Sequence, residues 1–163
     1  MALEKGKALS QQELLEKIRH YCAYQERSEL QVRRKLKALG SVDKQIPELI
    51  AALKQEDYLN ENRFVDQYIR SRASQKGWGP VKISQALKRE TGRDYSSAIS
   101  TDSEASARSM EKLEKEVLKK MEVLKHKKDL LMWEKLRFFC MQRGFDANTS
   151  YRLIDKLRLD FKG

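Results

Sequence analysis

Apolar residues recur every three or four positions along most of the chain, which is the spacing that places side chains on one face of an α-helix. In the first part of the chain, residues that typically begin or end helices divide this pattern into segments 10–24, 28–39 and 43–53. Ser10 with Glu13 and Ser28 with Gln31 have the spacing of a capping box. Gly40 suits a left-handed helix end, and Asp43 with Pro47 suits a helix start with proline in its first turn.

The helical pattern continues to the end of the chain. We expect one helix capped by Asn60, one that begins at Gly79 and Pro80, and a short one capped by Asp94. The later boundaries are expected at Thr101 with Glu104, which form a capping box before a long charged helix, near Lys128, at Gly144 and at Asp146. Among the leucines of the segment after Lys128, we expect the aromatic side chains to lie in the core. They are Trp133, Phe138 and Phe139.

A recurring unit is visible in these segments: a helix, a short basic turn, a second helix and usually a third. The turns occupy residues 26–28, 76–79 and 143–146, and their N-caps Ser28, Gly79 and Asp146 stand 51 and 67 residues apart. Seven glycines and two prolines in 163 residues leave little material for other turns. The sequence therefore predicts an all-α chain, built as a short array of diverged helical repeats.

The charge of the chain is strongly basic and unevenly distributed. Lys and Arg number 34 against 24 Asp and Glu, for a formal net charge of +10. Residues 63–93 hold eight basic and two acidic residues, and residues 119–163 hold 12 and six. An excess confined to two segments favours a polyanionic partner, either a phosphate backbone or an acidic protein groove.

Several functional classes find no support in the residues. The opening segment 1–17 has no long apolar run, so we expect neither a signal peptide nor a membrane anchor. We therefore expect a cytoplasmic protein. There is no nucleophile elbow or Gly-rich phosphate loop, and the two histidines lack ligand partners, so we expect no enzyme, no cofactor and no metal. The acidic residues Glu56, Asp57 and Glu61 are interpreted as a helix cap rather than a metal loop. Cys22 and Cys140 are interpreted as reduced core thiols.

Basic residues around the central turn form the candidate interaction surface. Trp78 in this turn either stacks on a base or a partner, or packs on the neighbouring helix with solvated lysines around it. A helix-turn-helix DNA reader has a similar turn, but the exposed residues of the second helix suit phosphate contact at least as well as base edges. The basic residues are Arg70, Lys76, Lys82, Lys88 and Arg89.

The central residues resemble the motif of RecX regulatory proteins. The resemblance rests on residues 58–64, Tyr68, Arg72, residues 76–80, Ile83 and Leu87. The flanks agree through Arg27, Ser28 and Leu36 before the motif and through residues 143–145, Ile154 and Leu157 after it, so the similarity spans most of residues 12–160. The Ser-rich residues 93–107 depart from the family pattern. The last repeat also has only two helices unless the long segment from Thr101 supplies the third.

The resemblance implies an elongated array of three tandem three-helix repeats, which we expect at residues 1–59, 60–101 and 102–163. It also implies a regulatory protein that binds the RecA filament on single-stranded DNA and modulates, mainly inhibits, RecA ATP hydrolysis and strand exchange. The partners implied are RecA and single-stranded DNA, contacted directly or through RecA, by a monomer. The alternative is a helical DNA- or RNA-binding protein that acts without RecA. The family contributes an interaction surface, which adds Arg72, Arg143 and Arg152 to the central basic residues and Trp78.

Overall fold

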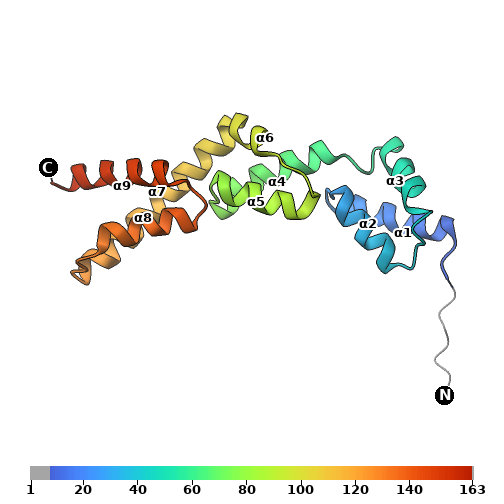
Figure 1. The fold of residues 1–163 in the computed structure, drawn as a ribbon, viewed down its shortest axis with the longest axis horizontal. Helices are drawn as coiled ribbons and strands as arrows, with labels where there is room; N and C mark the ends of the chain where they lie inside the picture. The colour runs from blue at the N-terminus through green and yellow to red at the C-terminus, as the bar shows by residue number, and fades with distance from the viewer. Residues whose placement is uncertain (1–7, 163) are drawn as a thin grey trace, which may run out of the picture. The chain divides into compact units, whose positions relative to one another are not determined.

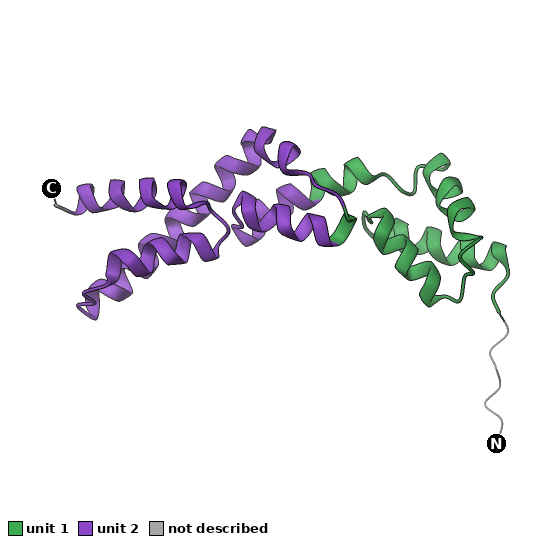
Figure 2. Cartoon of the chain, viewed as in Figure 1, with its two compact units in different colours: residues 1–67, 90–92 green, residues 68–89, 93–163 purple. Residues whose placement is uncertain are grey.

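The computed structural model describes residues 8–162, and within this range the regular elements are nine α-helices with no strand (Figure 1). The prediction of an all-helical chain with three-helix repeats is confirmed. The chain forms two compact units, of which one contains residues 1–67 and 90–92 and the other residues 68–89 and 93–163 (Figure 2). The expected division into repeats at residues 59 and 101 stays a prediction.

The first unit contains α1 (Gln11–Tyr24), α2 (Glu29–Ala38), α3 (Ile46–Gln55) and the start of α4 (Glu61–Lys76). Its core is built from one apolar face of each of the first three helices and includes Leu14, Ile18, Val32, Leu36 and Leu53. All five are at most 1% exposed, so their burial contributes to the hydrophobic stabilisation of this unit.

The helix ends of the first unit follow the predicted caps with one exception. Both capping boxes form, at Ser10 and at Ser28, and Gly40 ends its helix at a φ of 86°. The predicted cap Asp43 is wrong: α3 begins at Ile46 after Gln45, without a side-chain cap. Asp43 instead forms an ion pair with Lys37 at 3.2 Å, because the two residues between it and the helix form a turn.

Ser28 combines a helix cap with a link to a distant part of the chain. Its Oγ accepts a hydrogen bond from the Gln31 backbone N–H at 3.1 Å and donates one to the Glu90 carbonyl at 2.5 Å. The side chain is fully buried. We expect Ser28→Ala to lower the free energy of unfolding by about 2 kcal/mol, because it removes a cap and leaves the partly buried Glu90 carbonyl without this bond. Urea denaturation measures this loss. Ser10→Ala is the matched control, since Ser10 forms the same capping box at the surface, and its loss of about 1 kcal/mol should be clearly smaller. Equal losses would contradict a stabilising role for the Ser28–Glu90 bond.

The second unit contains most of α4 and of α5 (Pro80–Thr91), then α6 (Ser96–Thr101), α7 (Ser103–His126), α8 (Met132–Gln142) and α9 (Ala147–Lys162). The long helix α7 packs with α8 and α9 around Leu113, Val117, Leu136, Cys140 and Ile154, which are all completely buried. The long charged segment therefore supplies the third helix of the last repeat. The break expected near Lys128 is present, and Lys128 itself is left-handed with a φ of 52°.

Three expectations for the second unit are wrong. Asp94 is not the N-cap of α6, which is Tyr95 without a side-chain cap, and the Asp94 carboxylate instead accepts from Ser96 N–H at 2.9 Å. Thr101 and Glu104 do not form a capping box, because α6 runs through Thr101 and the Asp102 carboxylate caps α7 by accepting from Ala105 N–H at 2.9 Å. Phe138 is not in the core: its side chain is 61% exposed. Leu136 and Cys140 take the buried face of α8, and a residue midway between them on a helix points to the opposite side. Trp133 and Phe139 are partly buried against the core, as expected.

Candidate interaction surface

The turn between α4 and α5 interlocks with the turn between α8 and α9. Gly79 N–H donates to the Arg143 carbonyl at 2.7 Å, and Val81 N–H donates to the Gly144 carbonyl at 3.0 Å. The Ser109 hydroxyl of α7 donates to the Trp78 carbonyl at 2.6 Å. The backbones approach so closely that a Cβ added to Gly79 would lie 2.4 Å from the Gly144 oxygen. The central motif thus fixes its own turn against the third repeat.

Trp78 in this turn lies close to two cations. The Arg72 guanidinium carbon is 5.3 Å from the Trp78 ring centroid, and the Lys82 ammonium nitrogen is 4.8 Å from it. Arg72 also lies 4.7 Å from the centroid of Tyr68. These four residues, Tyr68, Arg72, Trp78 and Lys82, form what we call the aromatic–cation stack. Each cation–π contact contributes about 0.5–2 kcal/mol, depending on its desolvation.

The aromatic–cation stack is only partly exposed. Trp78 is partly buried and lines a small cavity with Ile69, Ala73 and Ile83. Arg72 Nε is buried and has no hydrogen-bond partner among the described residues, although buried donors are usually paired. Trp78 therefore packs on the neighbouring helices and still holds two cations at its ring.

The other central basic residues lie in solvent near this stack or at the end of α5. Arg70, Lys76, Lys88 and Arg89 are all exposed. Arg70 makes a single contact of 3.5 Å with the carboxylate of Asp102, which leaves most of its side chain in water. Lys88 and Arg89 occupy the last turn of α5, where the helix dipole also favours positive charge.

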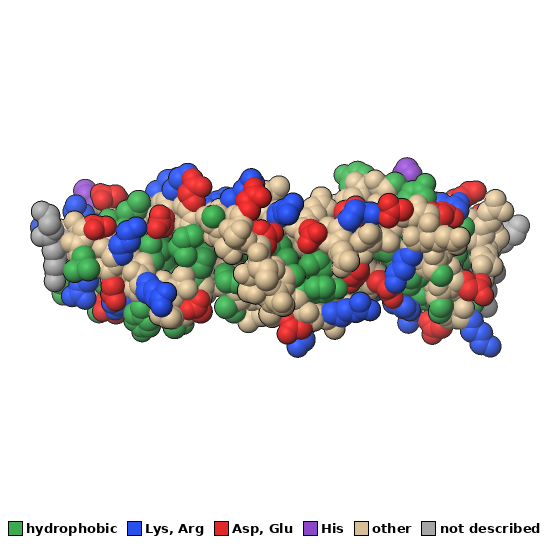
Figure 3. Space-filling model, turned by 90° about the horizontal axis from the view of Figure 1, so that it is seen from above, with side chains coloured by type: hydrophobic (Ala, Val, Ile, Leu, Met, Phe, Trp, Pro, Cys, Tyr) green, Lys and Arg blue, Asp and Glu red, His purple; other side chains and the backbone are tan. Residues whose placement is uncertain are grey.

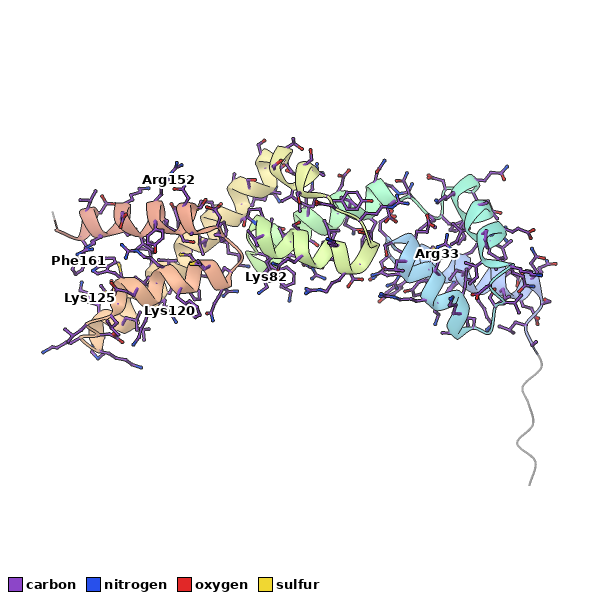
Figure 4. The ribbon with its side chains drawn as sticks, in the orientation of Figure 1. Arg33, Lys82, Lys120, Lys125, Arg152 and Phe161 are labelled. Atoms are coloured by element: carbon purple, nitrogen blue, oxygen red, sulfur yellow. The ribbon has the colours of Figure 1, made fainter. Side chains whose placement is uncertain are left out.

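The two basic residues of the third repeat differ in their surroundings. Arg143 forms an ion pair with Glu116 at 2.6 Å and lies 5.1 Å from the Phe139 centroid. It is next to Gly144, at which a Cβ would lie 2.3 Å from the Lys82 Cβ, so Arg143 belongs to the region of the stack. Arg152 is exposed on α9, and it projects from the edge of the unit opposite to Lys82 in Figure 4. The structure does not bring Arg152 together with the central residues.

Acidic side chains are mixed with the basic ones on the molecular surface seen in Figure 3. The acidic residues near the start of α4 form ion pairs with basic residues or cap a helix. Glu56 pairs with Arg19 at 2.5 Å, and Asp57 pairs with Arg63 at 2.6 Å. The Glu61 carboxylate accepts from Glu29 N–H at 2.8 Å. These carboxylates therefore neutralise cations and cap a helix, as the interpretation against a metal loop requires.

A cation–aromatic contact also occurs in the first repeat and was not predicted. The Arg27 guanidinium lies 3.9 Å from the centroid of Tyr21. Tyr21 lies seven residues before the N-cap Ser28, and Arg27 lies one residue before it. Arg72 and Trp78 lie at the same two distances before Gly79. The two repeats thus place the same kind of contact at equivalent positions with the aromatic and basic residues exchanged. Only an alignment of the repeats on their N-caps reveals this exchange in the sequence.

The described residues contain no group of three or more His, Cys, Asp or Glu side chains that could hold a metal ion. Burial raises the pKa of Cys22 and of Cys140 to about 11, so both thiols stay protonated and weakly nucleophilic at neutral pH. No helix in residues 8–162 has the length and apolar character needed to span a lipid bilayer.

Comparison with known proteins agrees with this architecture. A sequence profile described as the second three-helix domain of RecX matches residues 60–90, which contain the central turn. The Regulatory protein RecX of Oceanobacillus iheyensis is 27% identical over 139 residues, which is 85% of this chain and 51% of that protein. The Regulatory protein RecX of Shigella boydii is 34% identical over 84 residues, covering 45% of this chain and 50% of that protein. The chain spans about half the length of these curated relatives.

Solved structures share the fold. The crystal structure of RecX from Lactobacillus salivarius superposes with a TM-score of 0.78 at 21% identity, covering 91% of this chain and 97% of that one. A second crystal structure of a regulatory protein RecX gives a TM-score of 0.71 at 20% identity, covering 94% and 81%. The fold, the profile match at the central turn and the curated relatives together support the resemblance of this chain to RecX proteins.

Proposed function

We propose that this chain is a regulator of RecA that binds the RecA filament on single-stranded DNA and mainly inhibits its ATP hydrolysis and strand exchange. The observation that carries the proposal is the aromatic–cation stack with exposed Arg70 and Lys76 nearby on α4. A nucleoprotein filament presents phosphates and acidic protein groups together, and a basic surface with an aromatic centre is suited to both. The proposed contact residues are Arg70, Arg72, Lys76, Trp78, Lys82, Lys88, Arg89, Arg143 and, at the separate edge, Arg152.

A binding mechanism requires no covalent step from this chain. Lysine and arginine side chains that approach phosphates release condensed counterions, so affinity falls as salt rises. A rigid turn keeps the contact residues in place before binding, which reduces the entropy lost on association. Inhibition then follows if the bound chain stabilises a filament state that hydrolyses ATP and exchanges strands slowly. We propose accordingly that the protein is not an enzyme.

Reversing three charges of the surface tests the proposal. We expect the triple variant Arg70→Glu, Lys76→Glu and Lys82→Glu to bind RecA filaments on dT-rich single-stranded DNA at least tenfold more weakly. Its residual binding should depend less on salt, because fewer anionic groups are neutralised. Fluorescence anisotropy of labelled filaments and a strand-exchange assay measure the two effects. Circular dichroism should show nearly unchanged helicity, since all three charged groups are at the surface or its edge.

A matched triple separates the site from the overall charge. Lys17→Glu, Arg34→Glu and Lys44→Glu change the net charge by the same amount at exposed positions of the first unit. This control should keep filament binding within about threefold of the original value, as expected of charges outside the contact surface. If the central triple folds and still suppresses strand exchange at the original dose, the assigned surface is wrong.

Direct binding of nucleic acid without RecA is the second candidate function. The contact of Trp78 with two cations favours it, because aromatic rings beside basic groups bind unpaired bases and phosphates in single-stranded DNA and RNA. Gel shifts with dT30 in the absence of RecA distinguish the two functions. Tight binding at physiological salt would favour the second candidate, and binding that needs the filament would favour the first.

A further inference from the structure

The ring of Tyr21 in the first unit lies close to two cations, as the ring of Trp78 does in the second. The Arg27 guanidinium carbon is 3.9 Å from the Tyr21 centroid, and the Lys35 ammonium nitrogen is 5.5 Å from it. All three side chains of the first unit are partly buried. We call Tyr21, Arg27 and Lys35 the Tyr21 cluster. None of these three residues belongs to the contact surface proposed above.

A ring with two cations recurs at an equivalent position of the third repeat. Phe139 lies seven residues before the N-cap of α9, as Tyr21 lies seven residues before the N-cap of α2. Lys120 and Arg143 each lie 5.1 Å from the Phe139 centroid. With Trp78 in the second repeat, each repeat therefore places one aromatic ring and two cations around its turn.

The cations of the Tyr21 cluster form no ion pair with a carboxylate in residues 8–162. The carboxylates on either side of Arg27 in the sequence are engaged elsewhere. Glu26 pairs with Arg63 at 2.8 Å, and Glu29 pairs with Lys54 at 2.7 Å. The two positive charges of the cluster are therefore available to an anionic ligand.

Arg27 is held in a geometry that leaves the end of its guanidinium open. Its Nε donates to the Tyr21 carbonyl at 3.4 Å, while the guanidinium carbon lies over the Tyr21 ring. Its two terminal nitrogens have no hydrogen-bond acceptor in the described part of the chain. Such a planar fork can donate to two oxygens of one phosphate, and a neighbouring lysine adds a point charge. Contact with the ring also restricts Arg27 before binding, which reduces the entropy lost when a ligand binds.

We propose that Arg27 and Lys35, held at the ring of Tyr21, form a second site for the phosphates of single-stranded nucleic acid. A nucleic acid backbone offers the same anion at every nucleotide, which suits a site that recurs from repeat to repeat. The acidic side chains of a protein groove follow no such regular spacing. The proposal rests on the proposed function, because it assigns the ligand of a further contact site in the same regulator.

The third repeat is not included in this proposal. Arg143 already pairs with Glu116 at 2.6 Å, so one of the two cations at Phe139 is neutralised. The carboxylate of Glu116 would also repel a phosphate that approached this ring. The first two repeats, in which both cations at the ring lack such an ion pair in the described residues, are therefore the phosphate-binding ones.

Neutral variants of the full chain test the Tyr21 cluster. The probe is fluorescein-labelled dT30 without RecA, and fluorescence anisotropy measures its affinity from about 50 mM salt upward. The double variant Arg27→Gln and Lys35→Gln should bind about tenfold more weakly at the lowest salt. Its slope of log affinity against log salt should fall by about 0.7–1.4, as expected for the loss of one or two phosphate contacts to a single strand. Tyr21→Leu keeps both charges, so it should weaken binding about threefold and leave the slope unchanged.

A matched double variant controls for net charge. Lys17→Gln with Arg34→Gln removes the same charge at exposed positions of the first unit and should keep dT30 affinity within about twofold. Circular dichroism and thermal unfolding check that each variant is folded. If Arg27→Gln shifts the unfolding midpoint, Lys35→Gln alone serves as the second variant and should weaken binding about threefold.

Three results would overturn the proposal. The first is no binding of dT30 by the original chain at the lowest salt, and the second is equal affinity of the cluster variant and its matched control. The third is a cluster variant that binds RecA filaments more weakly but dT30 normally, since the cluster would then contact an acidic protein group. The Arg70, Lys76 and Lys82 triple separates this result from the proposed function. If only that triple loses filament binding, the Tyr21 site is wrong and the RecA surface stands; if only the cluster variant loses dT30 binding, the reverse holds.

Discussion

Replacing Gly79 by alanine should lower the free energy of unfolding by about 3–5 kcal/mol, because the new Cβ meets backbone rather than a flexible side chain. It would lie 2.4 Å from the Gly144 oxygen and 2.5 Å from the Gly144 carbonyl carbon. The two turns would have to separate, which would stretch the bonds from Gly79 N–H to Arg143 and from Val81 N–H to Gly144. Gly144→Ala should be at least as damaging, since its φ of 93° is unfavourable for alanine and its Cβ would lie 2.8 Å from Lys82 N.

A third glycine separates steric conflict from backbone strain. Gly40 has a φ of 86° but open space around its Cβ position, so Gly40→Ala should cost only about 1–2 kcal/mol. Gly79 has no left-handed φ, so its variant reports on the close approach alone. Urea denaturation of the three variants should rank them in the order Gly144, Gly79 and Gly40. A Gly79→Ala variant as stable as Gly40→Ala would show that the interlock of the two turns is loose.

Gly79 shows which features of the fold can be predicted from the sequence and which cannot. The pair Gly79–Pro80 predicts a helix start, and α5 does begin at Pro80. The hydrogen bond from Gly79 to the Arg143 carbonyl joins backbone atoms of distant residues, and any residue has a carbonyl to offer. Local signals of helix caps and apolar periodicity therefore predict the elements, but not which turn meets which.

Side-chain partners were equally hard to predict. The basic character of Arg143 is evident in the sequence, but its pairing with Glu116 depends on how α7 packs against α8. The exposure of Phe138 follows from α8 having one buried face, which Leu136 and Cys140 already occupy. An aromatic residue among leucines suggests a core position, but Phe138 lies on the face of the helix that points away from the core.

The aromatic–cation stack could be predicted only in part. The clustering of Arg70, Lys76 and Lys82 around Trp78 is a local feature of a helix, a turn and the next helix. The contacts of Arg72 and Lys82 with the Trp78 ring depend on side-chain rotamers that leave no mark on composition or spacing. The sequence thus indicates a basic surface, whereas the arrangement of cations around one ring requires the structure.

Removing a core side chain should affect stability strongly and binding hardly at all. Leu87 on α5 is completely buried, so Leu87→Ala should lower the free energy of unfolding by about 2–5 kcal/mol through lost burial and a residual cavity. Val81 is on the same helix but 44% exposed, and Val81→Ala should cost less than about 1 kcal/mol. Thermal and urea unfolding measure both losses.

The Leu87 variant also separates folding from recognition. At a temperature where Leu87→Ala is still folded, its affinity for RecA filaments should stay within about twofold of the original, because the lost side chain is completely buried. The charge-reversed triple should behave in the opposite way, with stability nearly retained and affinity lost. A folded Leu87→Ala protein that fails to bind would mean that recognition depends on the internal packing of α5, and the surface charges would then be insufficient to explain function.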